Sequence, residues 1–223
     1  PSSYSIAVYY SHNNRIYHNS FSTTLLYIES RNGSRFTPAN KWDNGYEGNY
    51  WLYYSGRDKE YDGLGDSAYS VGENNVDNFP LMGRFWDFIV LFEGRLYGIT
   101  VISNSTVSHF EFVSSDARIS LVVSGRNETW GFCRIAIPNA LIQEVENASV
   151  EFVIGGVQPV LLRNWSDSSN HYWYFSYIHS VNPTPENHDF WPVVYALGVS
   201  ALLISVVLIV FVVSRRRRKT SKM

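Results

Sequence analysis

The chain has 223 residues, with 18 Lys and Arg against 20 Asp and Glu, and it is rich in aromatic residues (16 Tyr, 13 Phe and 7 Trp). Six of the basic residues lie in the last nine positions, so the other 12 stand against all 20 acidic residues in the rest of the chain. This acidic balance argues against nucleic acid as a partner, and the many aromatic, Asn, Ser and Gly residues are typical of extracellular β structure with frequent turns.

The first segment, residues 5–21, has the pattern of very short strands. Apolar alternation begins at Ile6, and a polar corner followed by an apolar residue occurs twice, as Asn14-x-Ile16 and Asn19-x-Phe21. This pattern suits a parallel β-helix, in which stacked Asn side chains hydrogen-bond along the solenoid and apolar residues stack inside. A single coil cannot bury its own apolar face, so we expect further coils upstream.

Four motifs follow in a fixed order along residues 4–85: NNRIYHNSF, WDNGYEGNYW, DGLGDSAY and VDNFPLMG. Their order resembles the terminal portion of NosD-type right-handed parallel β-helix domains, which are common in archaeal surface proteins. The resemblance implies that residues 1–86 hold the terminal coils and capping region of such a domain. Trp42, Tyr50 and Trp51 are then expected to cap the open end of the solenoid, or to offer an aromatic surface to a ligand.

An acidic loop within this part, Asp58-x-Glu60-x-Asp62-Gly63-Leu64-Gly65-Asp66, has the oxygen spacing of a calcium site. The predicted ligands are the carboxylates of Asp58, Glu60, Asp62 and Asp66 and the backbone carbonyl of Leu64. The loop resembles thrombospondin type 3 and dockerin-like loops. Tyr69 at the twelfth position and the lack of flanking amphipathic helices exclude an EF-hand. The alternative is a solvated acidic turn.

Residues 87–182 alternate apolar and polar positions in short runs separated by turn residues, which predicts a β-sandwich. The expected strands are residues 88–92, 96–102, 110–113, 119–123, 132–137, 150–154, 160–162 and 172–181, with a helical turn at 139–142. Gly131–Pro138 resembles a small sandwich module that follows β-helices in archaeal surface proteins. That module has one more strand after His179-Ser180, where this chain continues into Asn182-Pro183.

Aromatic residues gather in the last of these strands, at 172–177. They suggest carbohydrate stacking, but alternation places Tyr172 and Tyr174 on one face and Trp173 and Phe175 on the other, so at least half of them are expected in the core. The single cysteine, Cys133, excludes an intrachain disulfide and is expected to be a buried small hydrophobe.

Residues 191–213 form an uncharged run rich in Val, Leu and Ile, reached through a Pro-containing linker at 183–190. At about 1.5 Å rise per residue, such a helix spans the roughly 30 Å hydrocarbon core of a bilayer. The basic tail, residues 214–223, stays in the cytoplasm, and its topology determinants are Arg215, Arg216, Arg217, Arg218 and Lys219. The sequence therefore predicts a single-pass protein of the cell membrane whose N-terminal part is extracellular. No signal peptide opens the sequence, so we expect a longer protein of which this is the C-terminal part.

Five sequons agree with an external location, and they make the protein a predicted glycoprotein: Asn32, Asn104, Asn127, Asn147 and Asn164 are the candidate acceptors. Ordinary turn chemistry explains the same Asn and Ser residues equally well.

These features predict a cell-surface protein that displays a β-helix to bind polysaccharide or other envelope components, or in a purely structural role. One alternative is the anchor region of a polysaccharide lyase or hydrolase whose active site lies upstream. A second is a periplasmic-type copper-binding β-helix protein, as the NosD resemblance suggests. No catalytic residue is predicted in this chain, because it has too few coils to form the groove in which β-helix enzymes display their acids and bases. Its six His residues lack close ligand spacing, so no copper ligand is assigned to a particular residue.

Overall fold

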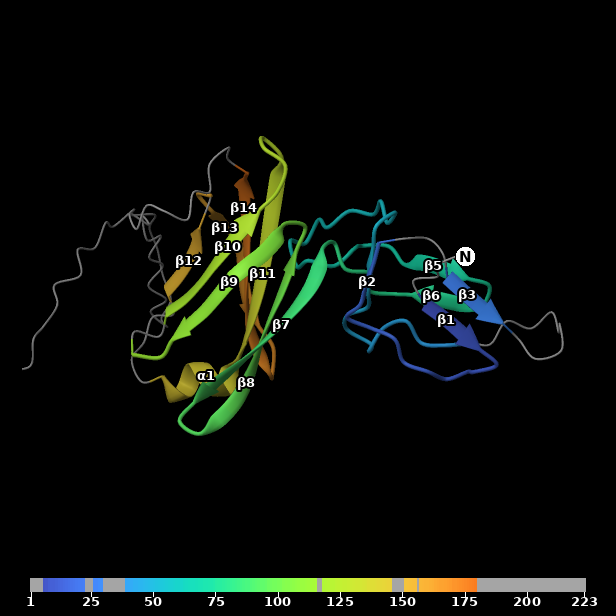
Figure 1. Ribbon diagram of the computed structural model, residues 1–223, viewed down its shortest axis with the longest axis horizontal. Helices are drawn as coiled ribbons and strands as arrows, with labels where there is room; N and C mark the ends of the chain where they lie inside the picture. The colour runs from blue at the N-terminus through green and yellow to red at the C-terminus, as the bar shows by residue number, and fades with distance from the viewer. Residues whose placement is uncertain are drawn as a thin grey trace, which may run out of the picture.

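The computed structural model describes residues 6–22, 26–29, 39–115, 118–145, 151–155 and 157–179 (Figure 1). Strands dominate these ranges, which confirms the prediction of a mainly β chain. Within them no helix has the length and apolar character needed to cross a bilayer. The predicted membrane span at 191–213 and the basic residues Arg215 to Lys219 lie outside the described residues.

The N-terminal part, residues 6–83, stacks short segments of chain in parallel, and we name it the stacked region. Strand β1 (Ile6–Tyr9) pairs with β3 (Leu26–Glu29), and β2 (Ser20–Phe21) pairs with β4 (Tyr50–Trp51). Two isolated parallel bridges extend the stack, Arg15 to Lys41 and Tyr50 to Leu81. The region ends in an antiparallel hairpin of β5 (Tyr69–Gly72) and β6 (Asn75–Asp77).

Polar side chains form two ladders across these stacked segments. In the first, Asn14 Nδ2 donates to Asn40 Oδ1 over 2.8 Å, and the backbone N–H of Asn40 donates to Asn75 Oδ1. In the second, Asn19 Nδ2 donates to Asn49 Oδ1, and the backbone N–H of Asn49 donates to Asp77 Oδ2. Stacked Asn side chains that hydrogen-bond along the chain segments are what the Asn corners of the sequence predict. Because the later ladder members are buried, these bonds satisfy polar groups that have little access to water.

The apolar centre of the stacked region is small and aromatic. Phe21 stacks on Trp51 with ring centroids 4.3 Å apart, and Trp42 packs beside both. Trp42 and Trp51 are almost fully buried, so neither offers its ring as a surface to a ligand. Both indole N–H groups are satisfied by the ladders, Trp42 by Asn75 and Trp51 by Asp77.

The remaining strands form two sheets that face each other across one core, and we name residues 84–179 the two-sheet region (Figure 1). A five-stranded antiparallel sheet has the order β13-β14-β11-β8-β7, and a three-stranded sheet has the order β12-β10-β9. The elements are β7 (Arg84–Phe92), β8 (Arg95–Ser103), β9 (Thr106–Val113), β10 (Arg118–Ser124), β11 (Trp130–Pro138), α1 (Asn139–Glu144), β12 (Glu151–Gly155), β13 (Val160–Ser166) and β14 (Asn170–Ile178). Each strand expected from the pattern overlaps one of these elements, and the expected helical turn lies in α1.

Strand β14 buries residues on both of its faces. Trp173, Phe175 and Tyr177 enter the core between the sheets, as alternation predicts. Tyr174, on the opposite face, is also buried, because it stacks on Phe132 and packs in a second apolar cluster that includes Leu81 of the stacked region. Cys133 is fully buried, as expected, and burial raises the pKa of its thiol to about 12.

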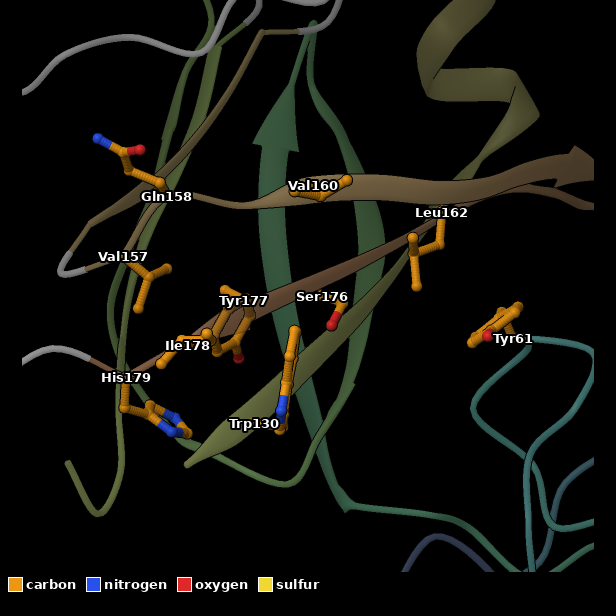
Figure 2. Close-up of a pocket in the computed structure, with 10 residues that line it drawn as sticks. All are labelled: Tyr61, Trp130, Val157, Gln158, Val160, Leu162, Ser176, Tyr177, Ile178 and His179. Atoms are coloured by element: carbon orange, nitrogen blue, oxygen red, sulfur yellow. The ribbon is translucent and has the colours of Figure 1, made fainter. Parts of the chain in front are cut away.

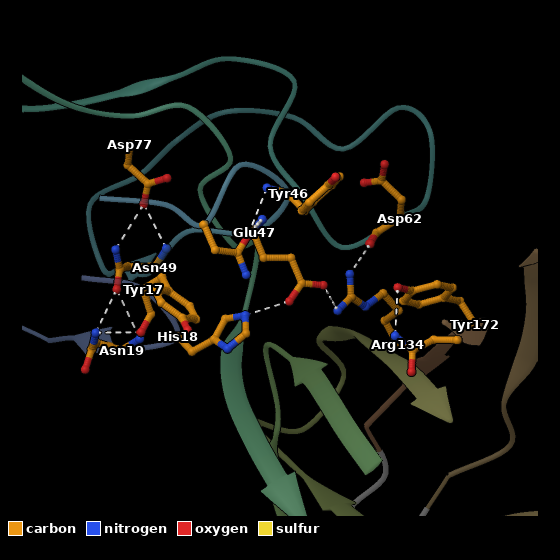
Figure 3. A network of polar contacts seen from close by, with 12 residues as sticks. Tyr17, His18, Asn19, Tyr46, Glu47, Asn49, Asp62, Asp77, Arg134 and Tyr172 are labelled. Carbon is orange, nitrogen blue, oxygen red and sulfur yellow. Dashed lines mark hydrogen bonds and ion pairs between the residues drawn. The ribbon is translucent and has the colours of Figure 1, made fainter. Parts of the chain in front are cut away.

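One ion pair joins the two regions (Figure 3). Arg134 on β11 is 2% exposed, and its guanidinium forms an ion pair with Glu47, whose other carboxylate oxygen lies 2.7 Å from His18 Nε2. Arg134 also donates to the backbone carbonyl of Asp62, and the His18 ring stacks on Phe85 of β7 at 3.8 Å. Burial works to raise the pKa of Glu47, but the charge of Arg134 and the hydrogen bonds from His18 and Arg134 lower it to about 2.

Candidate functional site

An open groove of about 1000 Å³ lies over β11, β13 and β14 of the five-stranded sheet (Figure 2). Ser176 lines it from the outer face of the sheet, because its neighbours Phe175 and Tyr177 enter the core between the sheets. Among the residues that the structure describes, the stacked region covers part of this face through Leu81, while Trp130, Val160 and Ile178 are exposed. The groove is lined by Tyr61, Trp130, Val157, Gln158, Val160, Leu162, Ser176, Tyr177, Ile178 and His179. Exposed apolar side chains in a concavity with a few polar groups are the usual composition of a ligand site.

Trp130 is the most exposed large side chain of the groove, at 71%. It begins β11, where its carbonyl accepts a hydrogen bond from Asn104 Nδ2. The next residue must be glycine, because a Cβ at Gly131 would lie 2.2 Å from the Tyr177 ring. The preceding loop is tied to β14 by His179, whose backbone N–H donates to the carbonyl of Thr129. The backbone on both sides of Trp130 is therefore fixed by hydrogen bonds and by the close packing of Gly131, while the indole itself is exposed.

The opposite side of the groove is Tyr61, which belongs to the acidic loop of the stacked region. Its ring meets Tyr174 edge to face at 5.8 Å. The loop is fastened to β13 by Arg163, whose Nη1 donates to the carbonyl of Glu60 over 2.6 Å. Arg163 in turn lies 4.5 Å over the Trp165 ring. Two aromatic side chains from separate regions, Trp130 and Tyr61, thus border the same concavity.

Polar groups at the groove belong to a hydrogen-bonded network beneath it. The Ser176 hydroxyl donates to the carbonyl of Gly131. His179 Nε2 lies 2.8 Å from Ser105 Oγ, and Ser105 Oγ lies 2.8 Å from the hydroxyl of Tyr177. A Ser and a His at this distance have the spacing of a nucleophile and its base. Here both side chains are almost fully buried, so we assign the pair to holding the floor of the groove.

The predicted calcium ligands lie in one loop, and several of their oxygens accept backbone N–H groups of that loop. Asp58 accepts from Asp62 and Gly63, Asp62 accepts from Leu64, and Asp66 accepts from Lys59 at 3.3 Å. Glu60 is exposed and contributes its carbonyl to Arg163. Partial burial raises the pKa of Asp58 despite these bonds.

No group of three or more His, Cys, Asp or Glu side chains within the described part of the chain is arranged to hold a metal ion. The hydrogen bonds in the loop give the carboxylates of Asp58, Asp62 and Asp66 partners without a cation. Calcium binding by Asp58, Glu60, Asp62, Leu64 and Asp66 therefore stays a prediction.

Three of the five candidate glycosylation residues lie in described parts of the chain. Asn127 and Asn164 are exposed, in the β10–β11 loop and on β13. Asn104 is exposed too, but its amide is engaged at both ends, by the Trp130 carbonyl and the backbone N–H of Phe132. Asn32 and Asn147 lie outside the described residues.

The roles of Trp130 and Tyr61 and the ion pair between Arg134 and Glu47 were not predicted from the sequence. The expected strand began at Phe132, and extending the alternation back two residues would have placed Trp130 on the same face as Arg134. The contact of Tyr61 with this sheet has no local sequence signal, because residues 61 and 174 are far apart in the chain. Comparison with protein-family models, curated proteins and solved structures finds no match to this chain.

Proposed function

We propose that this chain is a cell-surface protein that binds a glycan of the cell envelope in the groove bordered by Trp130 and Tyr61. In this proposal residues 191–213 span the membrane and the basic tail with Arg215 to Lys219 lies in the cytoplasm. Residues 6–83 form the end of a parallel β-helix, and the two-sheet region, as a β-sandwich, connects it to the span.

The observation that carries the proposal is the exposure of Trp130. A large aromatic ring left in water forgoes roughly 1.5–3 kcal/mol of burial free energy, and Trp130 shares the groove with the exposed apolar side chains of Val160 and Ile178, a grouping that marks interaction sites. Tryptophan and tyrosine combine an apolar face with a polar edge. Those two properties match a sugar ring, which has C–H groups on its faces and hydroxyls at its rim.

The stacked region supports the β-helix part of the proposal. Its strands pair in parallel with segments 20 to 31 residues further along the chain, as consecutive coils of a solenoid do. Two polar ladders run along the stack, at the corners where Asn residues were expected.

The proposal is tested with the full chain in lipid nanodiscs on a glycan array, comparing wild type with Trp130→Ala. Tyr53→Ala is the matched control, because Tyr53 is a similarly exposed aromatic residue (65%) outside the groove. We expect Trp130→Ala to lose the array signal and Tyr53→Ala to keep it. Equal signals from all three proteins would reject the groove as the binding site.

The same array run with calcium and with a chelator tests the acidic loop, because Tyr61 belongs to it. We expect calcium to raise the melting temperature and to strengthen binding, since a bound cation would stiffen the loop that carries Tyr61. If neither calcium nor chelator changes the melting temperature or the array signal, the calcium prediction is rejected. The proposal of glycan binding in the groove is not affected by that result.

The membrane location has a separate test. Protease added to intact cells should cleave the residues before 191, and alkaline carbonate should leave the protein in the membrane fraction. A protein that washes free in carbonate is not anchored by residues 191–213.

A further inference from the structure

A second groove, on the stacked region, differs in character from the one that Trp130 borders. It has a volume of about 570 Å³ and is lined by Arg15, Asn40, Lys41, Asp43, Asn44, Gly45, Asn74, Val76 and Asn78. Its side chains are mainly charged and amide groups. Val76, which is 41% exposed, offers an apolar surface within it.

Two cations lie side by side in this groove. Arg15 and Lys41 are paired by a parallel bridge, which places their backbones on adjacent stacked segments, roughly 4.8 Å apart as neighbouring strands are. Both residues are exposed, and neither forms an ion pair with a residue that the structure describes. Two adjacent positive charges repel each other, and an anion between them would remove that repulsion.

The one carboxylate of the groove is already occupied. Asp43 Oδ1 accepts the backbone N–H of Gly45, and its Oδ2 accepts both the backbone N–H and the amide of Asn78. These three bonds direct one acceptor oxygen of Asp43 to its own turn and the other to Asn78. Asp43 therefore does not neutralise Arg15 and Lys41 through a direct ion pair.

The amide groups of the groove leave donors available. Asn44 Oδ1 accepts the backbone N–H groups of Tyr46 and Glu47, so its NH₂ group is the part left for a ligand. Asn78 uses one amide hydrogen on Asp43 and has a second one. Arg15, Lys41, Asn44 and Asn78 together make a surface rich in donors, which matches a ligand rich in acceptor oxygens.

We propose that this groove binds the anionic group of an acidic saccharide, a uronate carboxylate or a sulfate ester, between Arg15 and Lys41. The amides of Asn44 and Asn78 bond ring hydroxyls, and Val76 contacts the sugar face. The inference rests on the proposed function for the saccharide part of the ligand, and it adds the charge of that glycan. The anionic part rests on the groove itself.

The test is isothermal titration calorimetry of the full chain in nanodiscs with a hexamer of galacturonic acid. The methyl-esterified hexamer has the same backbone without charge, and a sulfated galactan hexamer and inorganic sulfate separate the possible anion sources. We expect the acid hexamer to bind at least about tenfold more tightly than its ester, and to weaken between 0.05 M and 0.5 M salt because screening shortens the range of the charges.

The variants Arg15→Gln and Lys41→Gln should each lower the affinity for the acid hexamer by about tenfold, the usual effect of losing one charged hydrogen bond. Arg126→Gln is the matched control, an exposed arginine of the β10–β11 loop outside both grooves. Equal affinity of the control and the two variants would overturn the inference, as would tighter binding of the ester.

The same titration on Trp130→Ala separates this inference from the proposed function. Loss of array binding in Trp130→Ala with no effect of Arg15→Gln supports the proposed function and rejects anion binding in the groove of Arg15 and Lys41. Binding of the acid hexamer that depends on Arg15 and Lys41 but not on Trp130 supports anion binding in this groove and rejects one glycan site shared by the two grooves. A signal from inorganic sulfate as strong as that from the sulfated hexamer would show an ion site alone and overturn the saccharide part.

Discussion

The two regions of this molecule solve the same problem, burying short strands, by different means. The two-sheet region has strands of five to nine residues whose alternating side chains fill one shared apolar core. The stacked region has strands of two to four residues, too short to bury much apolar surface, and relies on ladders of Asn and Asp around a small aromatic centre. The stability of the first should therefore depend on side-chain volume, and that of the second on single hydrogen-bonding atoms.

The largest expected loss of unfolding free energy comes from breaking the ion pair between Arg134 and Glu47, which joins the two regions. Arg134→Met removes the cation that faces the partly buried Glu47 and leaves that carboxylate with His18 alone. Removing one member of a buried ion pair, which leaves the other charge unpaired, costs about 3–5 kcal/mol of unfolding free energy. Urea denaturation followed by circular dichroism measures the loss. The double variant Arg134→Met with Glu47→Gln should recover part of this loss. A double variant as unstable as the single one would argue against this ion pair as the contact that joins the two regions.

Low pH should weaken the same ion pair between Glu47 and Arg134 in the wild-type protein. The pKa of Glu47 falls from an ordinary value near 4.5 to about 2 in the folded protein. A lowered folded pKa means that the stabilisation is complete above pH 4.5 and is lost as pH falls toward 2. The shift corresponds to roughly 3 kcal/mol at most. Glu47→Gln should flatten this part of the profile, and an unchanged slope between pH 5 and pH 2 would assign it to other acids.

The stability of the protein should depend on a single acceptor atom of Asp77, the last residue of the second ladder. Asp77 accepts bonds on both oxygens, from Phe79 on Oδ1 and from Asn49 and Trp51 on Oδ2. Asp77→Asn replaces one acceptor by an NH₂ group that would face a donor, so we expect a loss of about 1–3 kcal/mol. Because burial raises the pKa of Asp77, this variant also tests whether part of that loss is offset at high pH. Thermal denaturation at pH 5 and pH 8 gives both quantities.

The matching change in the two-sheet region is the loss of one methyl group from its core. Ile135 on β11 is completely buried, and Ile135→Val should cost about 0.5–1.5 kcal/mol. The comparison between the regions holds if Asp77→Asn is the more damaging substitution even though it is isosteric. An Ile135→Val loss that exceeds the Asp77→Asn loss would break it.

The smallest expected effect on stability is at the groove. Trp130→Ala alters an exposed side chain, so its unfolding free energy should stay within about 0.5 kcal/mol of wild type. A larger loss would mean that Trp130 supports the sheet and is not held ready for a ligand.

Local patterns predicted much of this fold. Strand positions follow from alternation in runs such as 119–123, which became β10, and the Asn corners at 14 and 19 mark where the ladders form. The docking of one region on the other was not predictable in this way. The ion pair between Glu47 and Arg134 joins residues 87 positions apart, and neither residue has a sequence neighbour that identifies its partner.

The candidate site was predictable only in part, for the same reason. The acidic loop was visible as a spacing of carboxylates, but spacing does not say that Asp58 and Asp62 accept backbone N–H groups. The aromatic cluster at 172–177 suggested carbohydrate stacking, yet most of its members pack in the apolar clusters on the two faces of β14. Within the described part of the two-sheet region, the large aromatic side chain left exposed is that of Trp130.

The most direct test of glycan recognition in the groove is the indole N–H spectrum of the 15N-labelled full chain in nanodiscs, titrated with the strongest glycan from the array. Of the seven tryptophans, the Trp130 resonance should shift in proportion to bound ligand, while those of the buried Trp42 and Trp173 stay in place. A Trp130 resonance that does not move at saturating glycan would contradict the account.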